Sequence, residues 1–140
     1  MTEMRVYGSM KRSGRWWEVE IPSLGVFAQG KSRPDALRMV ADAIESLVNK
    51  RGFRIDVVPL ARDAFTVGAK DSATWLPFVL RRVRSVAGLS LAEVQKRLGA
   101  KSRNAYARYE RGVSEPTLSK LEELLHVVAP SAQVILTSAA

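Results

Sequence analysis

Apolar and polar residues alternate in three short runs at the start of the chain, which is the pattern of half-buried strands. The first run covers residues 4–10 and the second covers residues 16–21, with a turn at Gly14 between them. Pro22 ends the second run because proline cannot donate to a strand ladder, and residues 26–29 can return as a third strand. One face of the second run is formed by Trp17, Val19 and Ile21, and the other by Trp16, Glu18 and Glu20.

A helical spacing of apolar residues follows these strands. Ser32 can cap the helix, Pro34 fits its first turn, and Asp35 stands at the capping-box position. The apolar positions continue to Val48, and Gly52 is a natural C-cap. We therefore expect one helix here, packed on the strands that precede it.

Residues 53–60 predict a fourth strand, with Ile55 and Val57 facing inward. The order strand-strand-strand-helix-strand predicts a small sheet with one helix covering one face. Residues 61–73 have no strong period and predict a linker, although Phe65 and Val67 could still pack.

From Thr74 onward the apolar spacing is helical and predicts four short helices. Ser90 and Glu93 form a capping box at the start of the second helix. The first three helices are expected at residues 74–88, 90–99 and 102–110, the fourth begins after Ser114 or Thr117 and stops at Pro130, and residues 133–137 could form a last strand.

Composition narrows the possible chemistry. The chain has 140 residues, of which 46% are hydrophobic and 26% charged, so it can bury a core as one ordinary domain or two small ones. It has no cysteine and one histidine, His126, which excludes disulfides, a thiol nucleophile and multi-His or Cys-ligated metal sites. We expect no metal and no cofactor. No leader and no apolar run of about 20 residues is present, so we expect a cytosolic protein without membrane contact.

The charge is strongly positive and unevenly distributed. The formal net charge is +8, and residues 81–111 alone hold nine Lys or Arg residues against two Glu residues. A charge run is often only a solvated helical surface, but this concentration favours contact with phosphates and hence a nucleic-acid partner.

Short helices separated by glycine turns are typical of a helix-turn-helix. Leu89-Ser90, Glu93-Val94, Leu98-Gly99 and the segment Arg108-Tyr-Glu-Arg-Gly112 with Pro116 are similar to the Cro/phage-repressor (XRE) family. The chain departs from that family's usual pattern at three places. Leu91 replaces a common Gln, Gln95 replaces a small Ala, and the turn through Lys101 is one residue longer.

The resemblance places the third helix in the major groove, with its N-terminal residues against base edges. Arg103 can then grip guanine, Asn104 can grip adenine, and Ala107 can touch a thymine methyl. We expect phosphate contacts from Ser90, Lys101, Ser102, Arg108 and Arg111. Alternatively, Arg108 and Arg111 form salt bridges with Glu110 or a neighbour.

Other residues of this region are expected to be structural. We expect Glu110 to hold the turn after the third helix, and Tyr106 and Tyr109 to lie in or near the core. Such domains usually bind a palindrome as homodimers, and residues 133–137 are a candidate dimer element because a lone edge strand seeks a partner.

The first half carries a second resemblance. The run Trp17-Glu-Val-Glu-Ile-Pro-Ser-Leu-Gly-Val-Phe-Ala-Gln-Gly30, followed by Ser32 and Asp35-Ala-Leu37, resembles the N-terminal domain of HicB-like antitoxins over residues 4–60. That family implies a partial RNase H-like fold that is not a nuclease. The residues agree, because a nuclease of that fold needs several carboxylates around Mg²⁺ and residues 4–10 contain none.

Together the two resemblances predict an α+β protein with a HicB-like toxin-binding domain at residues 1–62, a linker at 63–73 and an XRE-type helix-turn-helix domain at 74–140. The implied function is that of a non-enzymatic antitoxin. It would neutralise a small HicA-like, mRNA-cleaving ribonuclease and repress its own operon by binding a palindromic operator. Candidate toxin contacts are Trp16, Glu18 and Glu20, because an acidic, aromatic face suits a basic partner.

Three alternatives remain open from the sequence. The chain could be a free-standing repressor whose first domain dimerises or senses a ligand. It could be a nuclease that uses the RNase H-like half, with Glu18 and Glu20 as a carboxylate pair, although these two fit the solvated face of a strand better. It could also be a purely RNA-binding module.

Overall fold

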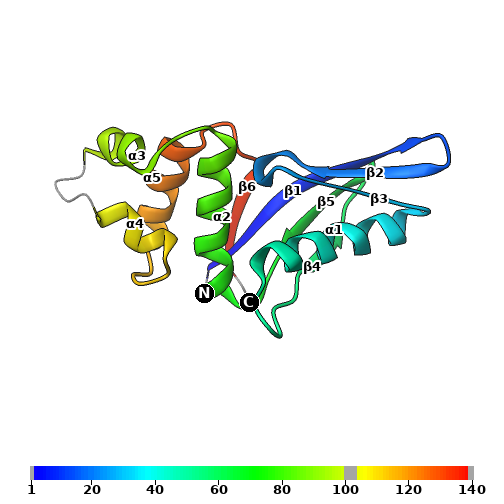
Figure 1. Ribbon diagram of the computed structural model, residues 1–140, viewed down its shortest axis with the longest axis horizontal. Coiled ribbons are helices and arrows are strands. Elements are labelled where there is room, and N and C mark those ends of the chain that lie inside the picture. The colour runs from blue at the N-terminus through cyan, green and yellow to red at the C-terminus, as the bar shows by residue number, and fades with distance from the viewer. Residues whose placement is uncertain (1, 100–103, 139–140) are drawn as a thin grey trace. The chain divides into compact units, whose positions relative to one another are not determined.

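The computed structural model describes residues 2–99 and 104–138 (Figure 1). The chain forms two compact units. The sheet unit contains Met1–Ser72 and Gln133–Ala140, and the helical unit contains Ala73–Ala132. The helical unit is therefore inserted between two strands of the sheet unit. The α+β class predicted from the sequence is confirmed.

The sheet unit is built around its first strand. The strand order is β3-β2-β1-β5-β4, with β6 also paired to β1, and every pairing is antiparallel. Its elements are β1 (Thr2–Ser13), β2 (Trp16–Ile21), a 3₁₀ turn η1 (Pro22–Leu24), β3 (Val26–Gly30), α1 (Arg33–Val48), β4 (Asp56–Pro59), β5 (Ala64–Gly68) and β6 (Val134–Ser138).

Helix α1 covers one face of this sheet and packs mainly on β3 and β2 (Figure 1). Val40 and Ile44 of α1 are fully buried, as are Val19 and Ile21 of β2. The predicted cap is present, because the Ser32 hydroxyl accepts a hydrogen bond from the Asp35 N–H at 3.2 Å. The alternation of β2 therefore separates a core face from an open face, as predicted.

The Gln-Gly motif at the end of β3 requires glycine at position 30 because α1 passes close to it. A Cβ at this position would lie 2.3 Å from the backbone nitrogen of Ala36. Real Cβ atoms do not approach that closely, so only glycine lets the first turn of α1 pass over the end of β3. The motif thus fixes how the covering helix meets the sheet.

The predicted linker at residues 63–73 is wrong. Residues Ala64–Gly68 form β5, which pairs with both β1 and β4, and Phe65 and Val67 are fully buried. A strand buried on both faces has no polar alternation, so its period gives no signal. The predicted fourth strand is also shorter than expected, since β4 covers only Asp56–Pro59 at the sheet edge.

The placement of the last strand also differs from the predicted domain boundary. β6 belongs to the sheet unit, and not to a C-terminal domain at 74–140. It pairs with Thr2–Val6 of β1 in its own chain, so one of its edges is occupied without a second copy. The premise that this strand is alone is therefore wrong, while its role as a dimer element stays a prediction. The physical reason is that β1 extends to Thr2 and offers it a ladder.

The helical unit contains α2 (Ser72–Val86), α3 (Leu91–Leu98), α4 (Ala105–Glu110) and α5 (Leu118–Val128). Helix α3 packs against α4 and α5. Of the two caps considered for the last helix, Thr117 is used, and its hydroxyl accepts from the Lys120 N–H. The buried apolar side chains of these three helices are Val94, Tyr106, Leu121, Leu124 and Val128.

Candidate nucleic-acid interface

The helix-turn-helix consists of α3, the segment after it and α4. Helix α3 opens with the predicted capping box: the Ser90 hydroxyl accepts from the Glu93 N–H at 3.1 Å, and the Glu93 carboxylate accepts from the Ser90 N–H at 3.2 Å. This backbone hydrogen bond holds the pKa of Glu93 below its ordinary value. Helix α3 ends at Gly99, which has a φ of 65° and supplies the left-handed C-cap.

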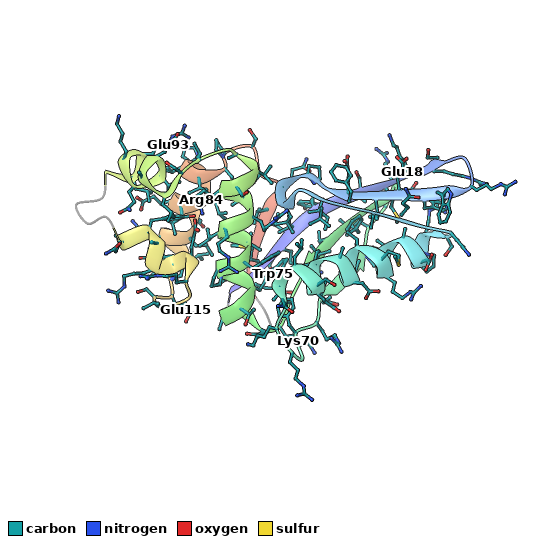
Figure 2. The ribbon with its side chains drawn as sticks, in the orientation of Figure 1. Glu18, Lys70, Trp75, Arg84, Glu93 and Glu115 are labelled. Atoms are coloured by element: carbon teal, nitrogen blue, oxygen red, sulfur yellow. The ribbon has the colours of Figure 1, made fainter. Side chains whose placement is uncertain are left out.

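Glu110, at the end of α4, is buried and tied to α2. Arg84, which is labelled in Figure 2, donates from Nε to Glu110 Oε2 at 2.6 Å and from Nη2 to Oε1 at 3.0 Å. The two bonds together form a two-pronged ion pair. Arg84 also donates to the Leu89 carbonyl, and Arg81 donates to the Glu110 carbonyl. The pKa of Arg84 is raised by its bond to Glu110. The cluster fixes the end of α4 against α2.

Tyr106 lies beneath this cluster and is 1% exposed. Burial raises the pKa of its hydroxyl above the ordinary value, and the nearby Glu110 carboxylate adds to the rise. The hydroxyl oxygen has no hydrogen-bond partner that meets normal geometry among the described residues. Tyr109 is half-buried. The prediction that both tyrosines lie in or near the core is thus confirmed.

Of the three predicted base contacts, the structure describes two, Asn104 and Ala107. Arg103 lies outside the described residues. Asn104 occupies the N-cap position of α4 and is exposed, and Ala107 is half-buried one turn further along the same helix. Helix α4 thus presents Asn104 at its N-terminal end, the end that enters the major groove in this motif. The base-reading roles stay predictions.

The structure likewise describes only some of the predicted phosphate contacts. Lys101 and Ser102 lie outside the described residues. Ser90, Arg108 and Arg111 are all exposed. Arg108 donates from Nε to the Ser114 hydroxyl at 3.2 Å, and the Glu110 carboxylate considered as its alternative partner is bound by Arg84 instead.

The charge count overstates the number of cations available to DNA. Arg81 and Arg84 lie in the basic run at 81–111, yet both are committed to Glu110. The sequence gives no local signal for this pairing, because Arg84 and Glu110 are 26 positions apart. Lys96 and Arg97, in the last turn of α3, are exposed.

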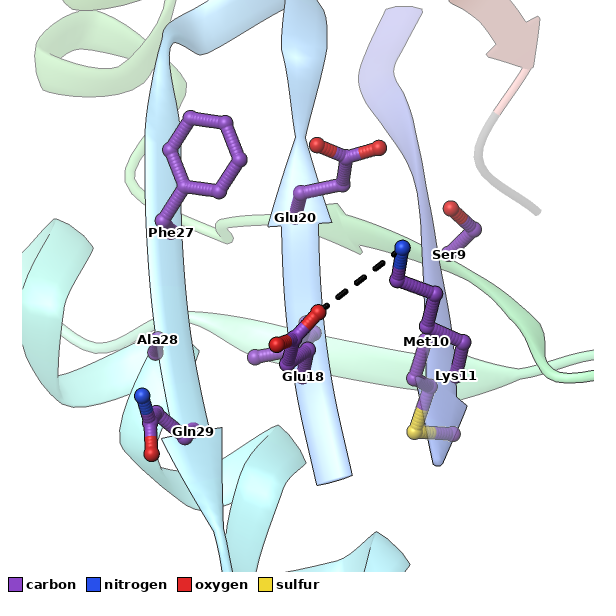
Figure 3. A pocket seen from close by; sticks show the side chains of 9 residues that line it. Ser9, Met10, Lys11, Glu18, Glu20, Phe27, Ala28 and Gln29 are labelled. Atoms are coloured by element: carbon purple, nitrogen blue, oxygen red, sulfur yellow. Dashed lines mark ion pairs between the residues drawn. The ribbon is translucent and has the colours of Figure 1, made fainter. Parts of the chain in front are cut away.

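The sheet unit has a second distinctive surface, on the sheet face opposite α1. The three predicted toxin contacts lie on this face, and Trp16 is 45% exposed. Phe27, which the sequence reasoning missed, stands beside Glu20 on the neighbouring strand and is 71% exposed (Figure 3). A depression of about 490 Å³ lies between these side chains, lined by Ser9, Lys11, Glu18, Glu20, Phe27 and Gln29 together with Met10, Val19 and Ala28.

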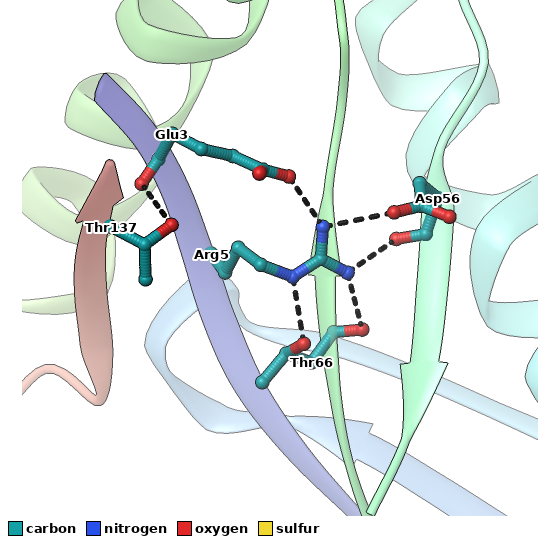
Figure 4. Close-up of polar contacts among 5 residues, drawn as sticks. All are labelled: Glu3, Arg5, Asp56, Thr66 and Thr137. Atoms are coloured by element: carbon teal, nitrogen blue, oxygen red, sulfur yellow. Dashed lines mark hydrogen bonds and ion pairs between the residues drawn. The ribbon is translucent and has the colours of Figure 1, made fainter. Parts of the chain in front are cut away.

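Strand β1 begins before the predicted residue 4 and therefore includes one carboxylate, Glu3, which Arg5 binds. Arg5 donates to the Glu3 and Asp56 carboxylates, to the Thr66 hydroxyl, and to the Asp56 and Thr66 carbonyls, so all five of its N–H groups are used (Figure 4). Gly68 allows this arrangement, because a Cβ there would lie 2.7 Å from Arg5 Nη1. Glu3 is thereby held in a structural ion pair.

Within residues 2–99 and 104–138, no three His, Cys, Asp or Glu side chains gather closely enough to hold a metal ion. No helix among these residues is both long and apolar enough to cross a membrane.

Comparison with known proteins identifies the helical unit. Residues 80–128 match the family model described as helix-turn-helix, which covers the second part of α2 and all of α3, α4 and α5. No curated protein and no solved structure is significantly similar to the chain. The match agrees with the XRE-type pattern of the sequence. The chain therefore contains a helix-turn-helix of the kind used in DNA-binding transcription regulation.

Proposed function

We propose that this protein is a HicB-like antitoxin that represses its own operon. The observation that carries the proposal is the presence, in one chain, of a helix-turn-helix and a small sheet whose open face carries exposed aromatic and acidic side chains. The HicB-like sequence pattern at residues 4–60 supports the assignment of the sheet unit.

The helical unit binds operator DNA in this proposal. Helix α4 enters the major groove with Arg103, Asn104 and Ala107 toward the bases. The exposed Arg108 and Arg111, with Ser90, Lys101 and Ser102, contact phosphates and set the register without reading sequence. One helix-turn-helix offers little contact area, so the protein binds a palindrome as a homodimer or larger homo-oligomer.

The sheet unit neutralises a HicA-like ribonuclease by covering its RNA-binding or catalytic surface. An enzyme that binds RNA presents cationic side chains, and the Trp16, Glu18 and Glu20 face offers the complementary chemistry. In this proposal the antitoxin acts by occlusion and performs no catalysis. Because operator DNA and the ribonuclease are both cytoplasmic in this proposal, the antitoxin acts in the cytoplasm.

A colony count tests this function. The small reading frame beside this gene is induced in cells with and without the full chain. We expect induction alone to stop growth and the chain to restore it. A harmless neighbour, or toxicity that the chain does not relieve, would contradict the antitoxin assignment. Mg²⁺-dependent RNA cleavage by the purified chain alone would contradict its non-enzymatic part.

A free-standing repressor is the second candidate, favoured by one observation: the family match covers only the helical part of the chain. In that case the sheet unit serves dimerisation or ligand sensing. Operator binding is common to both candidates, so only the presence of a neutralised toxin separates them.

A further inference from the structure

Glu20 and Phe27 form a side-chain pair on the open face of the sheet. They are direct cross-strand partners in the β2–β3 register, so their side chains point to the same side (Figure 3). Cross-strand partners have Cβ atoms about 5 Å apart, close enough for both to touch one guest group. Phe27 is 71% exposed, while Glu20 is half-buried beside it.

The two acidic side chains of this face are electrostatically different. Lys11 Nζ lies 3.8 Å from Glu18 Oε2, which partly compensates that carboxylate. The side chain of Glu20 forms no ion pair and no hydrogen bond with any described residue. A half-buried carboxylate without a partner attracts a cation more strongly than a paired one, because less of its charge is already neutralised. This difference singles out Glu20 as the open acceptor.

We propose that Glu20 and Phe27 anchor one arginine or lysine side chain of a basic protein partner, the carboxylate accepting its N–H groups and the ring contacting its cationic head or its stem. This inference rests on the proposed antitoxin function, whose partner is a basic ribonuclease, and it names the contact that recognises that partner. Local charge complementarity selects this occupant, because the Glu20 carboxylate is in no ion pair with a described residue and the Phe27 ring beside it is exposed.

The other face of the same sheet unit contains an intramolecular example of this chemistry. The Arg33 guanidinium carbon lies 4.3 Å from the centre of the Trp17 ring, and Arg33 Nε also bonds to the Asp63 carboxylate at 2.7 Å. A cation there is held jointly by an aromatic ring and a carboxylate. Glu20 and Phe27 present the same two groups with the cation's place open to a partner.

The test uses the full chain and the purified product of the adjacent small reading frame. Dissociation constants are measured by titration at several salt concentrations for wild type, Glu20→Gln, Phe27→Ala and Phe27→Leu. Asp42→Asn, at an exposed position of α1 outside the proposed binding face, is the matched control for loss of a carboxylate. Leu47→Ala, on an exposed α1 position, is the matched control for loss of apolar surface. Unchanged thermal unfolding and operator binding verify that each variant is folded.

We expect Glu20→Gln and Phe27→Ala each to weaken the complex by about tenfold or more, and Phe27→Leu by less, because it keeps apolar area and loses the ring. The controls should change affinity by less than about threefold. Glu20→Gln should also flatten the salt dependence, since a lost ion pair is no longer screened. Equal effects of Asp42→Asn and Glu20→Gln would overturn the assignment.

Two further outcomes separate this inference from the proposed function. If the wild-type chain forms no complex with the adjacent product, the antitoxin function and the anchor fall together. If wild type binds tightly and both Glu20→Gln and Phe27→Ala bind equally well, only the anchor is overturned. A change in the oligomeric state of the chain alone, measured by sedimentation of Phe27→Ala, would show that a second copy occupies this face and would also overturn it.

Discussion

Arg84 holds Glu110 through two parallel hydrogen bonds, of 2.6 and 3.0 Å, and thereby ties the last residue of α4 to α2. The side chain of Glu110 is only 5% exposed and that of Arg84 is 21% exposed. Removing one partner of a buried pair leaves the other charge uncompensated, which costs more than the pair itself contributes. The position of the end of α4 thus depends on a largely buried ion pair with α2.

Glu110→Gln should lower the free energy of unfolding of the helical unit by about 3 kcal/mol, because it leaves the Arg84 guanidinium without its counter-charge. Chemical denaturation followed by circular dichroism measures the change. Glu115→Gln, at an exposed position that forms no ion pair with a described residue, should change stability by less than about 0.5 kcal/mol. Equal stabilities for the two variants would show that the pair is dispensable.

Arg103→Ala should relax operator sequence preference, with a loss of about 1–3 kcal/mol on the operator and little loss on random DNA. Arg111→Ala should instead weaken binding to both DNAs alike and reduce the slope of affinity against salt by about one. Fluorescence anisotropy with both duplexes at several salt concentrations distinguishes the two. Equal losses for Arg103→Ala on both duplexes would make Arg103 a phosphate contact.

The buried Tyr106 hydroxyl should make the helical unit sensitive to alkali. Its pKa in the folded state is raised above the ordinary value of 10.0, so the folded state holds the proton more tightly than the unfolded state does. Its contribution is therefore fully present below pH 10 and is lost as pH rises above that value. Tyr106→Phe should remove this part of the loss, as thermal unfolding at a series of pH values would show. An unchanged alkaline slope in the variant would contradict it.

The capping box of α3 should respond to acid with the opposite sign. The pKa of Glu93 is lowered from its ordinary value of 4.5 by the Ser90 N–H, so the folded state favours the ionised carboxylate. Its contribution is present above pH 4.5 and is lost as pH falls through the lowered folded pKa. The stability difference between wild type and Glu93→Gln should shrink over that range, and a constant difference down to strongly acid pH would contradict this.

Breaking the β1–β6 ladder should destabilise the sheet unit. Ile135 faces Arg5 in this ladder, and proline at a paired position removes a donor and disturbs the strand. Ile135→Pro should lower the unfolding temperature, with increased hydrogen exchange at the amides of Thr2–Val6. Unaltered exchange at these amides would show that β6 contributes nothing to the sheet.

Local patterns in the sequence were sufficient for the elements whose causes are local. The alternation of β2, the helical spacing of α1 and the caps at Ser32 and Ser90 all depend on residues within a few positions of one another. The fold class followed from their order. The helix-turn-helix could be predicted for the same reason, since its capping box and glycine turns lie within one short segment.

The features that sequence reasoning missed depend on contacts between distant residues. The pairing of Thr2 with Ser138 and of Arg84 with Glu110 leaves no periodicity to detect. Strand β5 is short and is buried from Phe65 to Gly68, so its residues show no alternation that would predict a strand. Phe27 was read as an ordinary strand residue, because its exposure depends on which face α1 covers.

The two strands that flank the helical unit in sequence, β5 and β6, lie on opposite sides of β1, because Val6 pairs with Val67 on one edge and with Val134 on the other. The helical unit is consequently an insertion whose two ends both continue into strands of the sheet. A protease that cuts once within it releases neither piece, since each remains hydrogen-bonded to the same central strand. Proteolytic separation of the helical unit from the sheet unit therefore requires two cuts, one at each end of the insertion.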